Sequence, residues 1–156
     1  MYARILAAVD GSPGSMHALA HAADLARAQG GLLRIVHVVD MGLLPYGPEL
    51  SLDITPLIEA RRTGAEKLLA AARDAVAPTG LTLESGLIDL ATPGQSVAEA
   101  IAAHAGSWSA DLIVVGTQGR RGVERWLLGS VAEGIARRAP MPVLLVPAVP
   151  TEPVAA

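Results

Sequence analysis

The chain has 156 residues, 51% of them hydrophobic and 17% charged, which is the profile of one globular domain rather than of a disordered or collagen-like chain. A formal net charge of −3 and an aromatic content of 3% argue against nucleic-acid binding through a basic field or through stacked bases. The chain has no cysteine, which excludes thiol chemistry, and no P-loop pattern surrounds its single lysine, Lys67.

The sequence offers no segment that would direct the chain to a membrane. Met1 leads into an apolar stretch that ends at Asp10, which is too short for the core of a signal peptide. No uncharged apolar run reaches the 18 or so residues that a membrane helix needs. We therefore expect a cytoplasmic protein with no membrane segment.

The first half of the chain alternates between strand and helix patterns. The aliphatic run 5–9 predicts a buried strand, and Ser12 followed by Pro13 predicts a capped helix start. The run 32–39 predicts a second buried strand, interrupted by two polar residues. Apolar residues at helical spacing over 55–77, followed by Pro and Gly, predict a long second helix.

The second half continues this alternation. Residues 81–88 alternate in polarity and include a glycine, which favours an edge strand, whereas the runs 112–115 and 143–146 predict buried strands. Two capping boxes predict where the intervening helices begin: Thr92 with Gln95, and Ser130 with Glu133.

The order of these elements predicts a single α/β domain over 1–148 with a mostly parallel sheet, followed by a flexible tail over 149–156. Two connections, 40–54 and 116–129, are longer than usual for such a fold. The first is long enough to form a lid.

The loop after the fourth strand has the composition of an anion site. Gly116 and Gly119 are followed by three arginines, Arg120, Arg121 and Arg125, and then by Gly129 and Ser130 at a helix start. Glycines let a backbone approach an anion closely, and a helix N-terminus supplies free N–H groups. The same residues also fit a plain connection, in which Ser130 only caps the helix.

Histidines do not assemble a recognisable catalytic group. His17, His21 and Asp24 share one helix face at metal-ligand spacing, but no HExxH glutamate accompanies them, so a solvated polar face is the favoured interpretation. His37 and His104 have no partner visible in the sequence, and no GxSxG motif occurs.

Four landmarks together resemble the nucleotide-binding branch of the universal stress protein family. Gly116, Gly119, Gly129 and Ser130 match its pattern G-x2-G-x9-G-[ST]. The segments ILAAVDGS (5–12), IVHVVD (35–40) and APMPVLLVP (139–147) resemble its other landmarks, in order and over nearly the whole chain.

This resemblance implies a Rossmann-like, open five-stranded parallel sheet of order 3-2-1-4-5 with helices on both faces, and ATP, with or without Mg²⁺, bound between the first and fourth strands. It implies that Asp10 and the backbone near Val38 contact adenosine. It implies that the ribose and phosphates are wrapped by Gly116, Gly119, Gly129, Ser130 and Val131. We add Arg120 as a phosphate ligand, although it lies in the variable spacer of the pattern.

The resemblance also implies a homodimer through the last strand, Val143 to Val146, which would cover a flat aliphatic edge. The leading hypothesis is thus an ATP-binding, homodimeric sensor or regulator of stress responses. Two alternatives remain: a slow metal-dependent ATPase, for which Asp10 is the only base near the loop, and a partner-binding module that needs no nucleotide.

Overall fold

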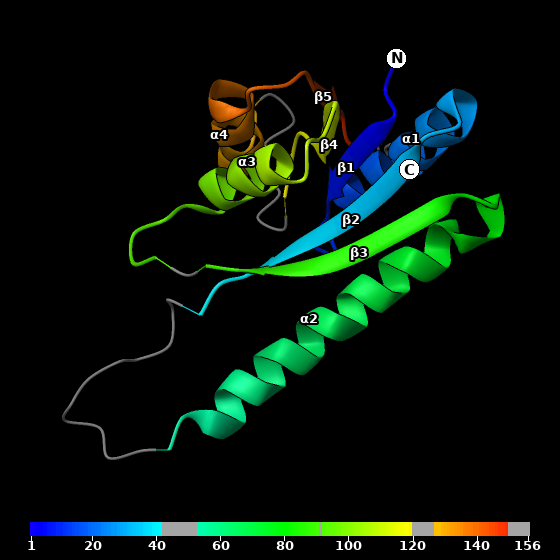
Figure 1. Cartoon of the computed structure of the whole chain (residues 1–156). Helices are drawn as coiled ribbons and strands as arrows, with labels where there is room; N and C mark the ends of the chain where they lie inside the picture. The colour runs from blue at the N-terminus through cyan, green and yellow to red at the C-terminus, as the bar shows by residue number, and fades with distance from the viewer. Residues whose placement is uncertain (42–52, 91, 120–126, 150–156) are drawn as a thin grey trace, which may run out of the picture.

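The computed structural model describes residues 1–41, 53–90, 92–119 and 127–149 and contains a five-stranded parallel sheet of order β3-β2-β1-β4-β5 (Figure 1). Parallel pairing joins each neighbouring pair of strands. The strand order and the parallel sheet are those that the family resemblance implies. The elements run along the chain as β1 (Arg4–Ala8), α1 (Pro13–Gln29), β2 (Leu32–Val39), α2 (Thr55–Val76), a 3-10 turn (Ala77–Thr79), β3 (Thr82–Asp89), α3 (Val97–Ser107), β4 (Leu112–Gly116), α4 (Ser130–Arg138) and β5 (Val143–Val146).

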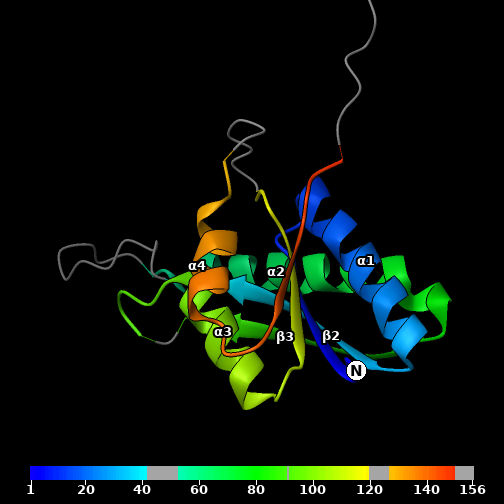
Figure 2. The ribbon, with the colours of Figure 1, turned by 90° about the horizontal axis from the view of Figure 1, so that it is seen from above.

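Helices cover both faces of the sheet, and the sheet divides the hydrophobic core into two layers (Figure 2). Alternate strand residues point to opposite faces, so Ile5 and Ile35 pack in the layer of α1 and α2, whereas Leu6 and Ile113 pack in the layer of α3 and α4. All four side chains are fully buried. The continuous aliphatic runs in the sequence therefore reflect burial on both faces.

Helix α1 begins where its sequence predicts. Ser12 is its N-cap, and the Oγ of Ser12 accepts a hydrogen bond from the backbone N–H of Ser15 at 3.2 Å. Gly30 ends the helix with a φ of 62°, a left-handed conformation that suits glycine.

The predicted capping box at Thr92 and Gln95 is wrong. Helix α3 begins at Val97, where Ser96 and Glu99 form the capping box: the Ser96 N–H donates to Glu99 Oε2 at 2.9 Å and the Glu99 N–H donates to Ser96 Oγ at 3.2 Å. The residues before it form a turn instead, because the Gln95 N–H donates to the carbonyl of Thr92 and the chain then leaves the turn in an extended conformation at Ser96.

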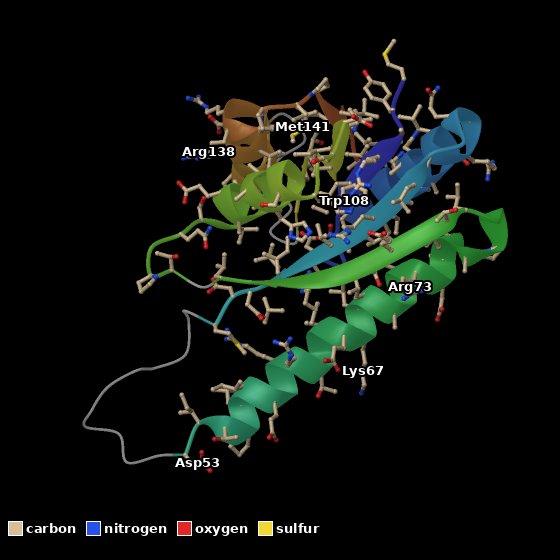
Figure 3. All side chains as sticks on the ribbon, viewed as in Figure 1. Asp53, Lys67, Arg73, Trp108, Arg138 and Met141 are labelled. Atoms are coloured by element: carbon tan, nitrogen blue, oxygen red, sulfur yellow. The ribbon has the colours of Figure 1, made fainter. Side chains whose placement is uncertain are left out.

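The amino end of the sheet is held by a polar network around Trp108, which is labelled in Figure 3. The guanidinium carbons of Arg4 and Arg34 lie 4.2 Å and 4.8 Å from the centre of the Trp108 ring. Arg34 also pairs with Glu84 at 2.6 Å and lies 3.3 Å from Nε2 of His104. His104 thus has a partner that the sequence does not reveal, and burial, reinforced by the Arg34 charge, lowers its pKa.

The two edges of the sheet differ. β3 is an edge strand, as its alternating sequence predicts, and α2 packs against it (Figure 1). β5 forms the opposite edge, where the side chain of Leu144 is 39% exposed.

Among the described residues, no helix combines the length and the apolar character that crossing a membrane requires.

Candidate functional site

A cavity of about 660 Å³ opens at the carboxyl ends of β1 and β4. The strand order reverses between these two strands, because β1 leads back to β2 and β3 while β4 leads on to β5. In open parallel sheets such a crevice is where ligands bind. We call this space the carboxyl-edge cavity; its walls are formed by residues 8–10, Ser15, residues 36–38, Val97, Ile101, residues 115–119 and residues 127–132.

The predicted site residues that the structure describes all line this cavity. Asp10 follows β1, Val38 lies near the end of β2, and the remaining five come from the end of β4 and the start of α4: Gly116, Gly119, Gly129, Ser130 and Val131. Arg120, like Arg121 and Arg125, lies outside the described residues. Most of the predicted lid, 42–52, and the tail beyond 149 lie outside them as well.

The carboxylate of Asp10 is held by the turn that leads into α1. Asp10 Oδ1 accepts a hydrogen bond from the Ser12 N–H at 2.9 Å, and the Asp10 N–H donates to Ser15 Oγ at 3.2 Å. The other carboxylate oxygen, Oδ2, lies toward Gly119: a Cβ added to Gly119 would be 3.0 Å from it. The side chain is therefore oriented before any ligand arrives.

The glycines of the loop permit close contacts between backbone segments. A Cβ on Gly116 would lie 2.9 Å from the carbonyl oxygen of Gly14, in the first turn of α1. A Cβ on Gly129 would lie 3.0 Å from the carbonyl oxygen of Thr117, which accepts a hydrogen bond from the Gly129 N–H at 2.7 Å. Two of the three pattern glycines thus fold the loop onto α1 and onto itself, which brings the start of α4 to the cavity.

The N-terminus of α4 carries no side-chain cap, so the predicted capping box of Ser130 and Glu133 is wrong. Gly129 is the N-cap residue, and Ser130 already has the first helical position. Glu133 instead pairs with Arg137 one turn later, at 2.7 Å. The first N–H groups of a helix have no partner within the helix, and here the residues that carry them, 130–132, line the cavity. Their donors and the positive end of the helix dipole suit an anion.

Part of the cavity lining, which we call the apolar wall, consists of hydrophobic side chains. Val38, Val97, Ile101 and Val115 line it together with Leu127, which is 61% exposed. Such a wall suits a flat heterocycle, with nearby backbone groups to orient it. The sequence does not identify Val97 and Ile101 of α3 as site residues, because an apolar position on a helix that faces a ligand has the same spacing as one that faces the core.

The charges in the cavity are few. Among the described residues that line it, Asp10 is the only carboxylate, and no lysine or arginine is present. His37 also lines it, and its Nδ1–H donates to the carbonyl of Val9 at 2.8 Å, a partner that the sequence does not reveal. The described part of the chain holds no group of three or more histidine and acidic side chains placed to bind a metal ion.

Comparison with known proteins agrees with this geometry. A family model described as the universal stress protein family matches residues 1–147. A protein of Staphylococcus haemolyticus that is named as a universal stress protein is 32% identical over 145 residues, which cover 93% of this chain and 84% of the relative. A crystal structure of a universal stress protein family member from Burkholderia pseudomallei is 32% identical, with a TM-score of 0.73 over 94% of this chain and 97% of that one.

Two further solved structures are complexes with nucleotides. A universal stress protein in complex with cAMP is 27% identical, with a TM-score of 0.69 over 95% of this chain and 99% of that one. The universal stress protein from Archaeoglobus fulgidus in complex with dAMP is 27% identical, with a TM-score of 0.63 over 93% of this chain and 98% of that one.

Proposed function

This chain belongs to the universal stress protein family, and from that premise we propose that it binds ATP in the carboxyl-edge cavity and acts as a homodimeric sensor or regulator of stress responses in the cytoplasm. The observation that carries the nucleotide assignment is the convergence, in one cavity, of an uncapped helix N-terminus, an oriented carboxylate and an apolar wall. These three features match the three parts of a nucleotide: phosphate, ribose and base. The two nucleotides named in the related structures both contain adenine.

Each part of ATP has candidate partners. The base lies against the apolar wall, and backbone groups near Val38 read its edge. Asp10 accepts hydrogen bonds from the ribose hydroxyls, because a carboxylate is an acceptor and this one is already oriented. The N–H groups of Ser130 and Val131, together with the backbone of Gly119 and the side chain of Arg120, hold the phosphates.

Several donors are needed to hold a triphosphate. A helix N-terminus contributes roughly 0.3 to 1 kcal/mol to an exposed anion and about 2 kcal/mol in a partly buried site. Hydrogen bonds to a charged group add about 1.5 to 3 kcal/mol each. Arg120 and Arg121 follow Gly119 directly in the sequence and would supply the charge that the described walls of the cavity lack.

Mg²⁺ would enter such a complex chiefly through the phosphates of ATP. This ion is usually bound by one or two carboxylates together with phosphate oxygens and water. Asp10, the only carboxylate among the described lining residues, is already assigned to the ribose, so phosphate oxygens and water would supply most of the ligands of the ion, which would neutralise part of the phosphate charge.

Calorimetric titration of the purified protein with ATP, AMP and cAMP, each with and without Mg²⁺, tests the ligand. We expect ATP to bind more tightly than AMP, since the added phosphates reach the start of α4. Binding of AMP or cAMP without binding of ATP would leave a nucleotide site but contradict the assignment of ATP. No heat with any of them up to about millimolar concentration would favour the partner-binding module instead. Native mass spectrometry of the protein as purified would show any nucleotide that it retains.

The homodimer is proposed through the open edge of β5. Leu144 and Val149 are exposed at this edge by 39% and 59%, and Pro142 and Pro147 flank the strand. An aliphatic strand edge pairs readily with another edge, and a second copy would cover it. Light scattering of the intact protein should give the mass of a dimer, and L144R should give that of a monomer. T82R, a new arginine on an exposed position of the opposite edge strand, should remain dimeric.

A further inference from the structure

A groove of about 450 Å³ lies beside β5, on the face of the sheet that α1 covers. His17 and His21 of α1 form one wall, and residues 144–149 of β5 and the segment after it form the other. The groove lies away from the carboxyl-edge cavity and shares none of its lining residues.

The two imidazoles in this groove are neighbours on α1. They are one helical turn apart, and their ring centres are 4.7 Å apart in an edge-to-face arrangement. Within the described part of the chain, neither side chain makes a hydrogen bond or an ion pair. Asp24, the third polar residue on this helix face, is instead paired with Arg27 at 2.5 Å.

Two imidazoles on consecutive turns of one helix can both reach a single metal ion. Neutral imidazole prefers zinc, copper, nickel and iron to magnesium or calcium. Zinc in a closed protein site takes four ligands in a tetrahedron, and His17 with His21 supplies two of them. The described residues of one chain contribute no third histidine or acidic side chain to this pair, so a closed site needs ligands from elsewhere.

A second copy paired through β5 would bring the same two histidines to this place. A twofold axis perpendicular to the sheet keeps both α1 helices on one face. Helix α1 packs on both β4 and β1, and it also contacts β5, the neighbour of β4. Because strands are spaced by about 4.8 Å, the β4 strands of the two copies would lie about 14 Å apart and the β1 strands about 24 Å apart, and the α1 helices would lie between these two distances.

The near end of this range suits a bridging ion. A helix with its side chains is about 10 to 12 Å across, so two helices at the near limit of about 14 Å leave roughly 2 to 4 Å between their side chains. Two zinc–nitrogen bonds of about 2 Å each span such a gap. His17 and His21 are on the side of α1 that faces the open edge, as their position in the groove requires.

We propose that His17 and His21 form half of a site for an imidazole-preferring divalent transition metal such as Zn²⁺, which the same two residues of a second copy complete across the β5 edge. This inference rests on the proposed homodimer and is independent of the proposed nucleotide. Because the ligands must be unprotonated, metal binding should weaken as the pH falls.

Titration of the EDTA-treated, nucleotide-free protein with ZnCl₂ tests the site, with light scattering to report the mass before and after. We expect one Zn²⁺ per two chains, and no comparable heat with MgCl₂. The double variant H17Q/H21Q should lose the zinc binding. H104Q, which removes an imidazole on the other face of the sheet, and D24N, which alters the next turn of the same helix face, should retain it.

The outcomes separate the metal site from the dimer. No zinc uptake, or uptake that H17Q/H21Q retains, overturns the site while leaving a metal-free dimer standing. One Zn²⁺ per chain overturns the contribution of the second copy. A protein that is monomeric in EDTA and becomes dimeric only with zinc supports the shared site and shows that the β5 edge alone does not hold the dimer. A monomer under both conditions refutes the homodimer and the shared site together.

Discussion

Gly134 allows α4 to lie unusually close to α3, and G134A should lower the stability of the protein. A Cβ at position 134 would lie 2.5 Å from the Cβ of Ala98, whereas carbon atoms in contact are about 3.5 to 4.0 Å apart. The two helices would have to separate by roughly 1 to 1.5 Å, because neither methyl group can rotate away. Overpacking of this kind costs about 1 to 3 kcal/mol.

The same substitution also has a favourable effect, because alanine has a higher helix propensity than glycine, and substitution of a second glycine allows that effect to be measured alone. Alanine is better than glycine in a helix interior by about 1 kcal/mol, so G134A should lose about 1 kcal/mol net. Gly64 lies within α2, and a Cβ there would meet no atom within 4 Å. G64A should therefore gain up to about 1 kcal/mol, and the two variants should differ by about 2 kcal/mol.

Urea denaturation of the two variants and the parent protein measures this difference, and thermal melting should show midpoints about 2 to 4 °C below and above the parent. The double variant A98G/G134A should recover part of the loss, because it removes the methyl group that the new one meets. A G134A protein as stable as G64A would refute the close approach of α3 and α4. Since α4 begins at the carboxyl-edge cavity, G134A should also weaken nucleotide binding.

Three further predictions follow from individual contacts. G119V should weaken ATP binding about tenfold or more while the protein stays folded, because a side chain at this exposed position would meet the carboxylate of Asp10. An unchanged ATP affinity in calorimetry would exclude this loop as the phosphate site. Burial lowers the folded-state pKa of His104 below its ordinary 6.5, so the free energy of unfolding should fall as the pH drops from about 7.5 to about 5.5. The fall should be smaller in H104Q. An equal dependence of the unfolding free energy on pH in the two proteins, measured by urea denaturation, would contradict this. S96A should lose about 1 kcal/mol of stability and T92A almost none, as measured by urea denaturation; the reverse result would restore the helix start that the sequence favours.

The pattern of apolar and turn residues along the chain is enough to predict the kinds of element, their order and most of their positions. The strands 32–39 and 143–146 occupy the predicted residues. The first is covered on both faces, as its aliphatic run predicts, whereas the second is the open edge of the sheet rather than a buried strand, since Leu144 is exposed. Ser12 caps α1 as predicted, since a serine before a proline leaves few competing helix starts. The glycine pattern after β4 also located the loop that lines the cavity.

Local patterns failed where two of them competed. Thr92 with Gln95 and Ser96 with Glu99 have the same capping spacing, and the second pair prevails in the folded chain, where it places Ala98 and Ile101 in the core. Ser130 and Glu133 have the spacing of a capping box in the sequence. In the structure the Gly129 N–H donates to the carbonyl of Thr117, and Gly129 rather than Ser130 is the N-cap of α4.

Which distant residues meet is set by the packing of the folded chain. The alternation of strands and helices is compatible with several strand orders; the family resemblance implies one of them, and the pairing of the strands shows that order. The apolar wall joins Val38 to Val97, 59 residues further along the chain, and the groove joins His21 to Leu144, 123 residues further along. Periodicity reports which face of an element is buried, but the partner of that face is set by packing across the whole sheet.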